Sequence, residues 1–212
     1  MQPIRSIEDL HAGYRRFKEG RFTEARDRYR HLSEEGQSPS VMLIACCDSR
    51  ADPALIFDAG PGELLVLRDV ANLVPPPEDD NAFHGTSAAI EFAVTGLGVQ
   101  QIVIMGHAQC GGVRAYVDGA LGQGGNNRYI DRWASLLKPA YDRLPAGLPA
   151  PEAAAELEKS AIRYSLEQLR SFPFVAERES AGTLSTHGAF FGIATGVLEW
   201  LDGGKGDFRP IA

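Results

Sequence analysis

Cysteine is scarce in this sequence, and the scarcity limits what its thiols can do. The 212 residues include only three cysteines, an odd number that does not suit a disulfide framework. We therefore expect a reducing compartment, where a cysteine with a chemical role is usually a metal ligand or a nucleophile. Two of the three, Cys46 and Cys47, are nevertheless adjacent, in the stretch IACCDSRADP. This raises the question of which of the two thiols has a chemical role.

Long apolar runs and a surplus of positive charge are also missing. No run approaches the roughly 18 apolar residues of a membrane span, and the first ten residues, MQPIRSIEDL, lack the apolar segment of a secretory signal. The formal net charge of −7 argues against a nucleic-acid partner, because phosphate binding requires excess Lys and Arg. We therefore expect a cytoplasmic protein that binds neither nucleic acid nor a membrane. Its composition, with 44% hydrophobic and 23% charged residues, is typical of a globular domain.

The chain begins with a segment whose pattern differs from the rest. Ser6 and Asp9 resemble a capping box, and apolar residues then recur at helical spacing in two stretches that Gly20 separates. We expect two amphipathic helices in an N-terminal arm, residues 1–35. The remainder, residues 36–212, is predicted to form a single α/β domain.

Three apolar runs of this second segment have the length of buried strands. VMLIAC (41–46), LLVLRDV (64–70) and QIVIMG (101–106) are almost continuously apolar, like strands covered on both faces of a parallel sheet. The Ala-rich stretch between the last two predicts a helix with Thr86 as its N-cap, which completes a βαβ unit. Later segments predict two helices and a hairpin, in residues 129–144, 152–172 and 183–202. The expected fold class is α/β, with a mostly parallel central sheet, flanking helices and an N-terminal helical arm.

Residues capable of binding a metal follow two of these strands. Cys46 ends the first predicted strand, and His107 and Cys110 come directly after the third. Because the carboxyl ends of parallel strands meet at one edge of a sheet, these three side chains can converge. Two thiolates and an imidazole suit Zn²⁺, and three protein ligands leave a fourth position open, as in catalytic zinc sites. Packing without a metal and a structural zinc closed by Asp48 are the alternatives.

Strand alternation separates the two adjacent cysteines. Cys46, Asp48 and Arg50 lie at i, i+2 and i+4 and are expected to point to one side, whereas Cys47 and Ser49 point to the other. We therefore interpret Cys46 as the metal ligand and Cys47 as a packing residue rather than a redox thiol. Asp48 and Arg50 predict an ion pair beside the metal, either structural or functional.

In these residues and their surroundings, the chain resembles the β-class carbonic anhydrases. The resemblance covers residues 36–200 and rests on motifs in the family's order: CCDSR, PGELLVLRDVANLVPP, GTSAAIEFAV, GHAQCGG and HGAFFGIATGVL. It implies a zinc enzyme that reversibly hydrates CO₂ to bicarbonate and a proton, with zinc held by Cys46, His107 and Cys110. It also implies that Asp48 and Arg50 form the catalytic dyad. In some members this aspartate closes the metal shell as a fourth ligand.

The resemblance further implies a substrate pocket and an oligomer. The positions that match substrate contacts, partly from a neighbouring subunit, are Gln37, Gly111, Gly112, Leu65, Val70 and Phe92. The family fold dimerises with its N-terminal helices over the partner, so we expect a homodimer or a dimer of dimers. Leu65, Asp69 and Phe92 replace the family's frequent Phe, Asn and Tyr, which bears on pocket shape rather than on the zinc ligands.

Two other functions are compatible with this site. One is hydrolysis of COS or CS₂ on the same metal, as some relatives of the family perform. The other is zinc or bicarbonate binding with little turnover. The presence of Asp48, Arg50 and Gln37 argues against binding alone, because a binding protein would not need the dyad.

Overall fold

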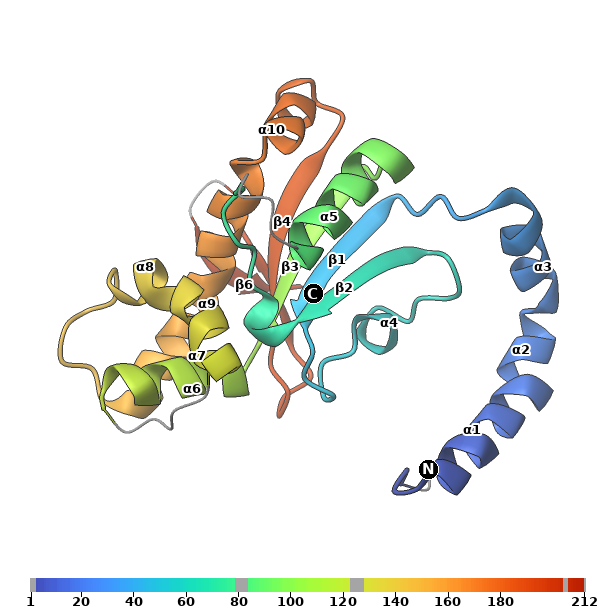
Figure 1. The fold of residues 1–212 in the computed structure, drawn as a ribbon, viewed down its shortest axis with the longest axis horizontal. Helices are drawn as coiled ribbons and strands as arrows, with labels where there is room; N and C mark the ends of the chain where they lie inside the picture. Colours follow the sequence, from blue (N-terminus) through green and yellow to red (C-terminus); the bar gives the residue numbers. More distant parts are fainter. Residues whose placement is uncertain (1–2, 79–83, 123–127, 204–205, 212) are drawn as a thin grey trace.

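A six-stranded sheet forms the centre of the computed structural model, which describes residues 3–78, 84–122, 128–203 and 206–211. The strand order is β2-β1-β3-β4-β5-β6 (Figure 1). The first four strands in this order are parallel, and β5 and β6 are added antiparallel. The strands are β1 (Val41–Cys46), β2 (Leu64–Asp69), β3 (Gln101–His107), β4 (Ser185–Phe191), β5 (Leu198–Leu201) and β6 (Phe208–Pro210). This architecture confirms the predicted α/β fold with a mostly parallel sheet.

Both faces of the sheet are buried, which explains why β1 is apolar throughout and why β3 is apolar from Ile102 to Met105. One face packs against α5 (Gly85–Glu91), the π-helical segment η2 (Phe92–Leu97), α9 (Ala150–Arg170) and α10 (Pro173–Ser180). The strand residues that form this core are Met42, Ile44, Ile102 and Ile104. The intervening residues Leu43, Ala45, Val103 and Met105 pack on the other face, with α4 (Pro53–Ile56) and β5.

A group of helices gathers beyond the carboxyl ends of the strands (Figure 1). They are α6 (Gly111–Ala120), α7 (Arg128–Ala134), the 3-10 segment η3 (Ser135–Leu137) and α8 (Lys138–Tyr141). They pack with the first half of α9 in an apolar cluster that also buries Cys46 and Cys110. The two thiols are therefore shielded by helices that follow them in the chain.

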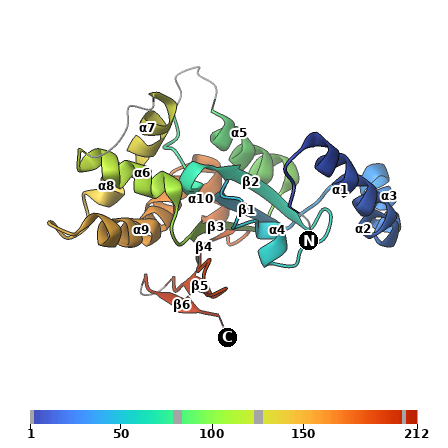
Figure 2. The same cartoon turned by 90° about the horizontal axis from the view of Figure 1, so that it is seen from below.

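The N-terminal helices lie apart from this body. They are α1 (Ile7–Glu19), α2 (Arg21–Glu24) and α3 (Arg26–Glu35), and none of them contains a buried residue. Figures 1 and 2 show them as an arm that extends away from the sheet. The capping box of Ser6 and Asp9 is present as expected, but the second predicted helix is divided at Ala25. The separation into units 1–35 and 36–212 stays a prediction.

Two local expectations were wrong. Thr86 is not an N-cap, because α5 starts two residues earlier than expected, with His84 at the cap position, and the Thr86 hydroxyl instead donates to Asp69 Oδ2 at 3.3 Å. The helix expected in residues 129–144 is broken into α7, η3 and α8, with Pro139 in the first turn of α8, where a missing N–H is tolerated. Within the described parts of the chain, no helix combines the length and apolar composition needed to cross a bilayer.

Candidate active site

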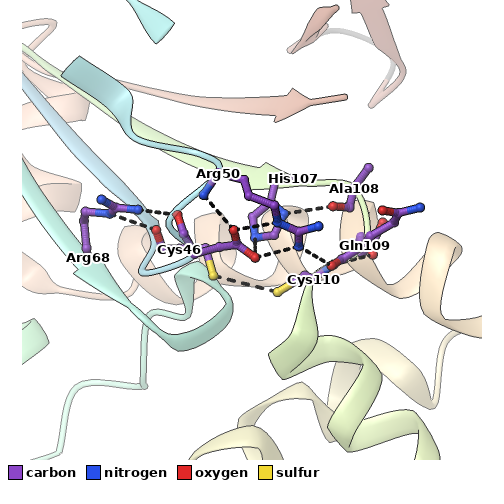
Figure 3. A network of polar contacts seen from close by, with 9 residues as sticks. Cys46, Arg50, Arg68, His107, Ala108, Gln109 and Cys110 are labelled. Carbon is purple, nitrogen blue, oxygen red and sulfur yellow. Dashed lines mark hydrogen bonds and ion pairs between the residues drawn. The ribbon is translucent and has the colours of Figure 1, made fainter. Parts of the chain in front are cut away.

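Two strand ends and one helix start bring two thiols and an imidazole together. Cys46 ends β1, His107 ends β3, and Cys110 is the N-cap residue of α6. All three are buried, and their potential ligand atoms lie within 4.8 Å of one another. The Sγ atoms of Cys46 and Cys110 are 3.8 Å apart (Figure 3). Two sulfurs that are each about 2.3 Å from a tetrahedral zinc would have about this separation, so the pair fits zinc.

The imidazole of His107 is oriented as a metal ligand. Its Nδ1 lies 2.9 Å from the carbonyl oxygen of Ala108, so Nδ1–H donates to that carbonyl and the lone pair is left on Nε2. Nε2 is buried and has no hydrogen-bond partner among the described residues. A buried nitrogen left in this way is costly unless something binds it. A zinc ion between Nε2 and the two sulfurs would satisfy it.

The two thiols interact, so their protons differ in how easily they are lost. The hydrogen bond from Cys110 lowers the pKa of Cys46, and the same contact, together with burial, raises the pKa of Cys110. The pair therefore loses one proton readily and shares the second, which it holds tightly. Zinc binds thiolates, so metal binding would displace the shared proton and supply the positive charge that this buried pair lacks.

Asp48 and Arg50 form the expected pair beside this group. Arg50 Nε and Nη2 donate to Asp48 Oδ1 and Oδ2 at 3.0 and 2.8 Å, and the Arg50 backbone N–H donates to Oδ1 at 2.9 Å. These bonds hold the pKa of Asp48 well below its usual range. Asp48 Oδ2 lies 3.8 Å from His107 Nε2, so an ionised carboxylate borders the metal position without belonging to the Cys-His-Cys group.

Gln109 and Glu158 support this site and were not predicted from the sequence. Gln109 has a left-handed backbone with φ of 58°, and its carbonyl accepts a hydrogen bond from Arg50 Nη2 at 3.1 Å. Glu158 of α9 is buried, and its Oε1 accepts the backbone N–H of Cys110 at 2.9 Å. The only signal for Glu158 was an acidic residue on the apolar face of a long helix. Nothing in the sequence indicated the turn at Gln109.

Comparisons with known proteins agree with this geometry. The profile of the family described as carbonic anhydrase matches residues 41–198. The chloroplastic β carbonic anhydrase 5 of Arabidopsis thaliana is 31% identical over 196 residues, which are 91% of this chain and 64% of the plant protein. The structure of the β-carbonic anhydrase CcaA matches with a TM-score of 0.84 at 30% identity, over 97% of this chain and 92% of its own.

The chain belongs to the β-carbonic anhydrase family. A tetrameric β-carbonic anhydrase from the ascomycete Sordaria macrospora matches it at 27% identity with a TM-score of 0.73, over 97% of this chain and 100% of its own. The chain thus has the fold of these enzymes along nearly its whole length, while it spans just under two thirds of the plant relative.

Three of the substrate positions that the family suggests, Gly111, Gly112 and Val70, lie beside the metal group. Gly112 follows Cys110 by two residues in α6, and a Cβ at Gly112 would lie 2.5 Å from Val70 Cγ1. The close approach of these two segments therefore requires glycine at this position. Gly111 is exposed at the start of the same helix.

Gln37 and Leu65 are not brought to the metal group of the same chain, and Phe92 is largely exposed. Gln37 is exposed and precedes β1, whose far end carries Cys46; five residue steps of strand span roughly 16 Å. Leu65 pairs with Met42, four register positions before Cys46 and thus roughly 13 Å away along the strand. Phe92 is 52% exposed on η2.

Cys47 differs from its expected role. It is exposed in this chain, not packed in the core. Its backbone N–H donates to the Asp69 carbonyl at 2.7 Å, so its main chain is tied to β2 while its thiol remains accessible. Alternation predicted correctly that Cys46 would join the metal group, but the side on which Cys47 lies is not covered by its own chain.

Proposed function

We propose that this protein is a zinc enzyme that catalyses the reversible hydration of CO₂ to bicarbonate and a proton. The observation that carries the proposal is the buried Cys46–His107–Cys110 group with an ionised Asp48 beside it, held by Arg50. These three residues would hold the zinc. When bound, zinc supplies a Lewis acid that lowers the pKa of a water molecule and so provides a nucleophile near neutral pH.

The residues of the chain would prepare this nucleophile. Because the pKa of Asp48 is low, the carboxylate remains a hydrogen-bond acceptor throughout the neutral range. It would accept a hydrogen bond from the attacking water and orient its lone pair toward CO₂. The backbone N–H groups at the start of α6, at Gly111 and Gly112, would face the oxygen atoms on which charge develops. If Asp48 left Arg50 for the metal, the fourth position would be closed and turnover would stop.

The complete pocket is proposed to need a second copy of the chain. Gln37 and Leu65 match substrate positions of the family but lie away from the metal group of their own chain, and Phe92, a third such position, is largely exposed. A partner subunit would bring such residues to the pocket. We propose a homodimer or a dimer of dimers, and the tetrameric relative from Sordaria macrospora is compatible with the latter. We also propose a cytoplasmic location, because the three cysteines are free thiols and a reducing compartment preserves them.

Stopped-flow measurement of CO₂ hydration on protein of known zinc content tests this function. The zinc-loaded protein is expected to turn over CO₂, and Arg50→Ala is expected to retain about one zinc per chain and lose roughly 10–100-fold in kcat. Arg143→Ala is the matched control, since Arg143 also binds a carboxylate through two bonds, to Glu167 at 2.7 and 2.9 Å, but on the exposed surface. Zinc-loaded protein that hydrolyses COS or CS₂ but leaves CO₂ unchanged would replace this proposal with the alternative reaction.

A further inference from the structure

Arg68 of β2 places its guanidinium against the backbone that carries the first metal ligand and the dyad. Its Nε donates to the carbonyl of Cys46 at 3.0 Å, and its Nη2 donates to the carbonyl of Asp48 at 2.5 Å (Figure 3). Its Nη1 donates to Asp52 Oδ2 at 3.1 Å. One side chain thus joins three acceptors along the segment that leaves β1.

This segment has little other connection to the sheet. The ladder between β1 and β3 ends at Ala45, and the ladder between β1 and β2 ends at Cys46. One further backbone bond follows, from the Cys47 N–H to the Asp69 carbonyl at 2.7 Å. Beyond that point, the bond from Arg68 to the Asp48 carbonyl continues the attachment to β2 where the main-chain pairing has stopped.

The main-chain carbonyl and the side-chain carboxylate of Asp48 are therefore bound by two different arginines. Arg68 binds its carbonyl, which also accepts the Ala51 N–H at 3.1 Å and so closes a tight turn. Arg50, within that turn, binds its carboxylate. Since the main chain of Asp48 sets the direction of its side chain, a shift of the turn would move the carboxylate relative to His107 Nε2, now 3.8 Å away.

We propose that Arg68 is a positioning residue that keeps Asp48 on Arg50, and off the metal, by fixing the backbone of Cys46 and Asp48. The inference rests on the proposed function, and it assigns to Arg68 no contact with substrate. The role requires arginine, because a planar guanidinium can donate to two carbonyls and a carboxylate at once, and a lysine ammonium on a flexible stem cannot reproduce that fork.

The test compares Arg68→Gln and Arg68→Lys with the control Asp52→Asn. Asp52→Asn removes the charge of the third partner but keeps an amide oxygen for the Ala54 N–H at the start of α4, and it leaves both carbonyl bonds of Arg68 intact. We expect the control to remain within about twofold of the parent in kcat. Arg68→Gln should keep about one zinc per chain and lose roughly 10–100-fold in kcat, as typical partners of metal ligands do.

A double-mutant cycle separates positioning from general damage. If Arg68 acts through Asp48, then Arg68→Gln should cause little further loss in a protein that already carries Asp48→Asn. Cobalt in place of zinc gives a readout without activity, because its visible spectrum reports the ligand set. We expect Arg68→Gln to change this spectrum as the carboxylate moves toward the metal, and the added Asp48→Asn to restore it.

Three results would overturn the proposal. The first is a kcat within about twofold of the parent and an unchanged cobalt spectrum in Arg68→Gln. The second is an equal loss on the parent and on the Asp48→Asn background. If Arg68→Gln fails to fold, Arg68→Lys carries the same comparison, and an unchanged cobalt spectrum there is the third. A parent protein without CO₂ hydration would remove the proposed function, while the cobalt spectra would still decide the role of Arg68.

Discussion

Cys46 and Cys47 are neighbours in the chain with opposite surroundings. Cys46 is 4% exposed and its Sγ faces that of Cys110, whereas Cys47 is exposed. Cys46→Ala is therefore expected to lose zinc and CO₂ hydration, while Cys47→Ser keeps both. Metal analysis and stopped-flow kinetics on the two variants check this. Loss of zinc in Cys47→Ser with retention in Cys46→Ala would reverse the assignment.

At this scale the sequence was informative because the chemistry lies in short motifs at strand ends. Cys46, His107 and Cys110 were expected to converge, and they lie within 4.8 Å of one another. The Asp48–Arg50 pair was expected from i, i+2 spacing and is present. Cys47 was placed wrongly because alternation gives the side on which a residue lies, but it does not say whether that side is covered.

Among the elements, α9 supports the metal group through one buried carboxylate. Glu158 Oε1 accepts the Cys110 N–H at 2.9 Å, and without it that N–H would be buried and unpaired. Glu158→Leu should weaken zinc binding roughly 10–100-fold, whereas Glu158→Gln, which keeps the acceptor oxygen, should remain near the parent. Competition with a chromophoric chelator measures the affinity. Equal zinc affinity in Glu158→Leu and the parent would exclude this role for α9.

The end of β2 carries a titratable group whose burial has a consequence for stability. Burial raises the pKa of Asp69 to about 7, although the Leu73 N–H and the Thr86 hydroxyl lower it. A carboxyl with a raised folded-state pKa binds its proton more tightly in the folded protein. The free energy of unfolding should therefore fall as pH rises from about 4 to about 7, by a few kcal/mol at most, at roughly 1.4 kcal/mol per pKa unit.

The variant Asp69→Asn tests whether the free energy of unfolding falls with pH because of this carboxyl. The variant keeps an oxygen for the Leu73 N–H and has nothing to ionise, so its stability advantage over the parent should be larger at about pH 8 than at about pH 5.5. Urea unfolding at both pH values, on protein with matched zinc content, gives the comparison. An advantage that is the same at both pH values would mean that Asp69 does not titrate between them in the folded protein.

Element positions were predictable where a single segment determines them. The boundaries of β1 follow from an uninterrupted apolar run, and they agree with Val41–Cys46. The start of α5 was misjudged because the Thr86 hydroxyl binds Asp69, a residue on another element. Glu158 and Arg68 were not identified for the same reason, since their partners Cys110, Cys46 and Asp48 are distant in the chain.

For the molecule as a whole, two features are not explained by contacts within a single chain. Two of the expected substrate residues, Gln37 and Leu65, lie away from their own metal group, and the arm α1–α3 contains no buried residue. The sequence could predict both the helices of the arm and the motifs of the pocket. It could not place one against the other, because that contact is proposed to lie between subunits.

The arm therefore carries the prediction about assembly. Ile7, Leu10 and Tyr14 are 61%, 49% and 61% exposed on α1, an apolar surface that one chain leaves open to water. Deleting residues 1–35 should give a smaller assembly in light scattering and lower CO₂ hydration, because the proposed partner contact is lost. Zinc should stay bound, since none of the three ligands belongs to the arm. As a control, Arg15→Ala changes an exposed polar residue of the same helix and should leave assembly unchanged. A truncated protein with the size and full activity of the parent would show that the arm does not hold the subunits together.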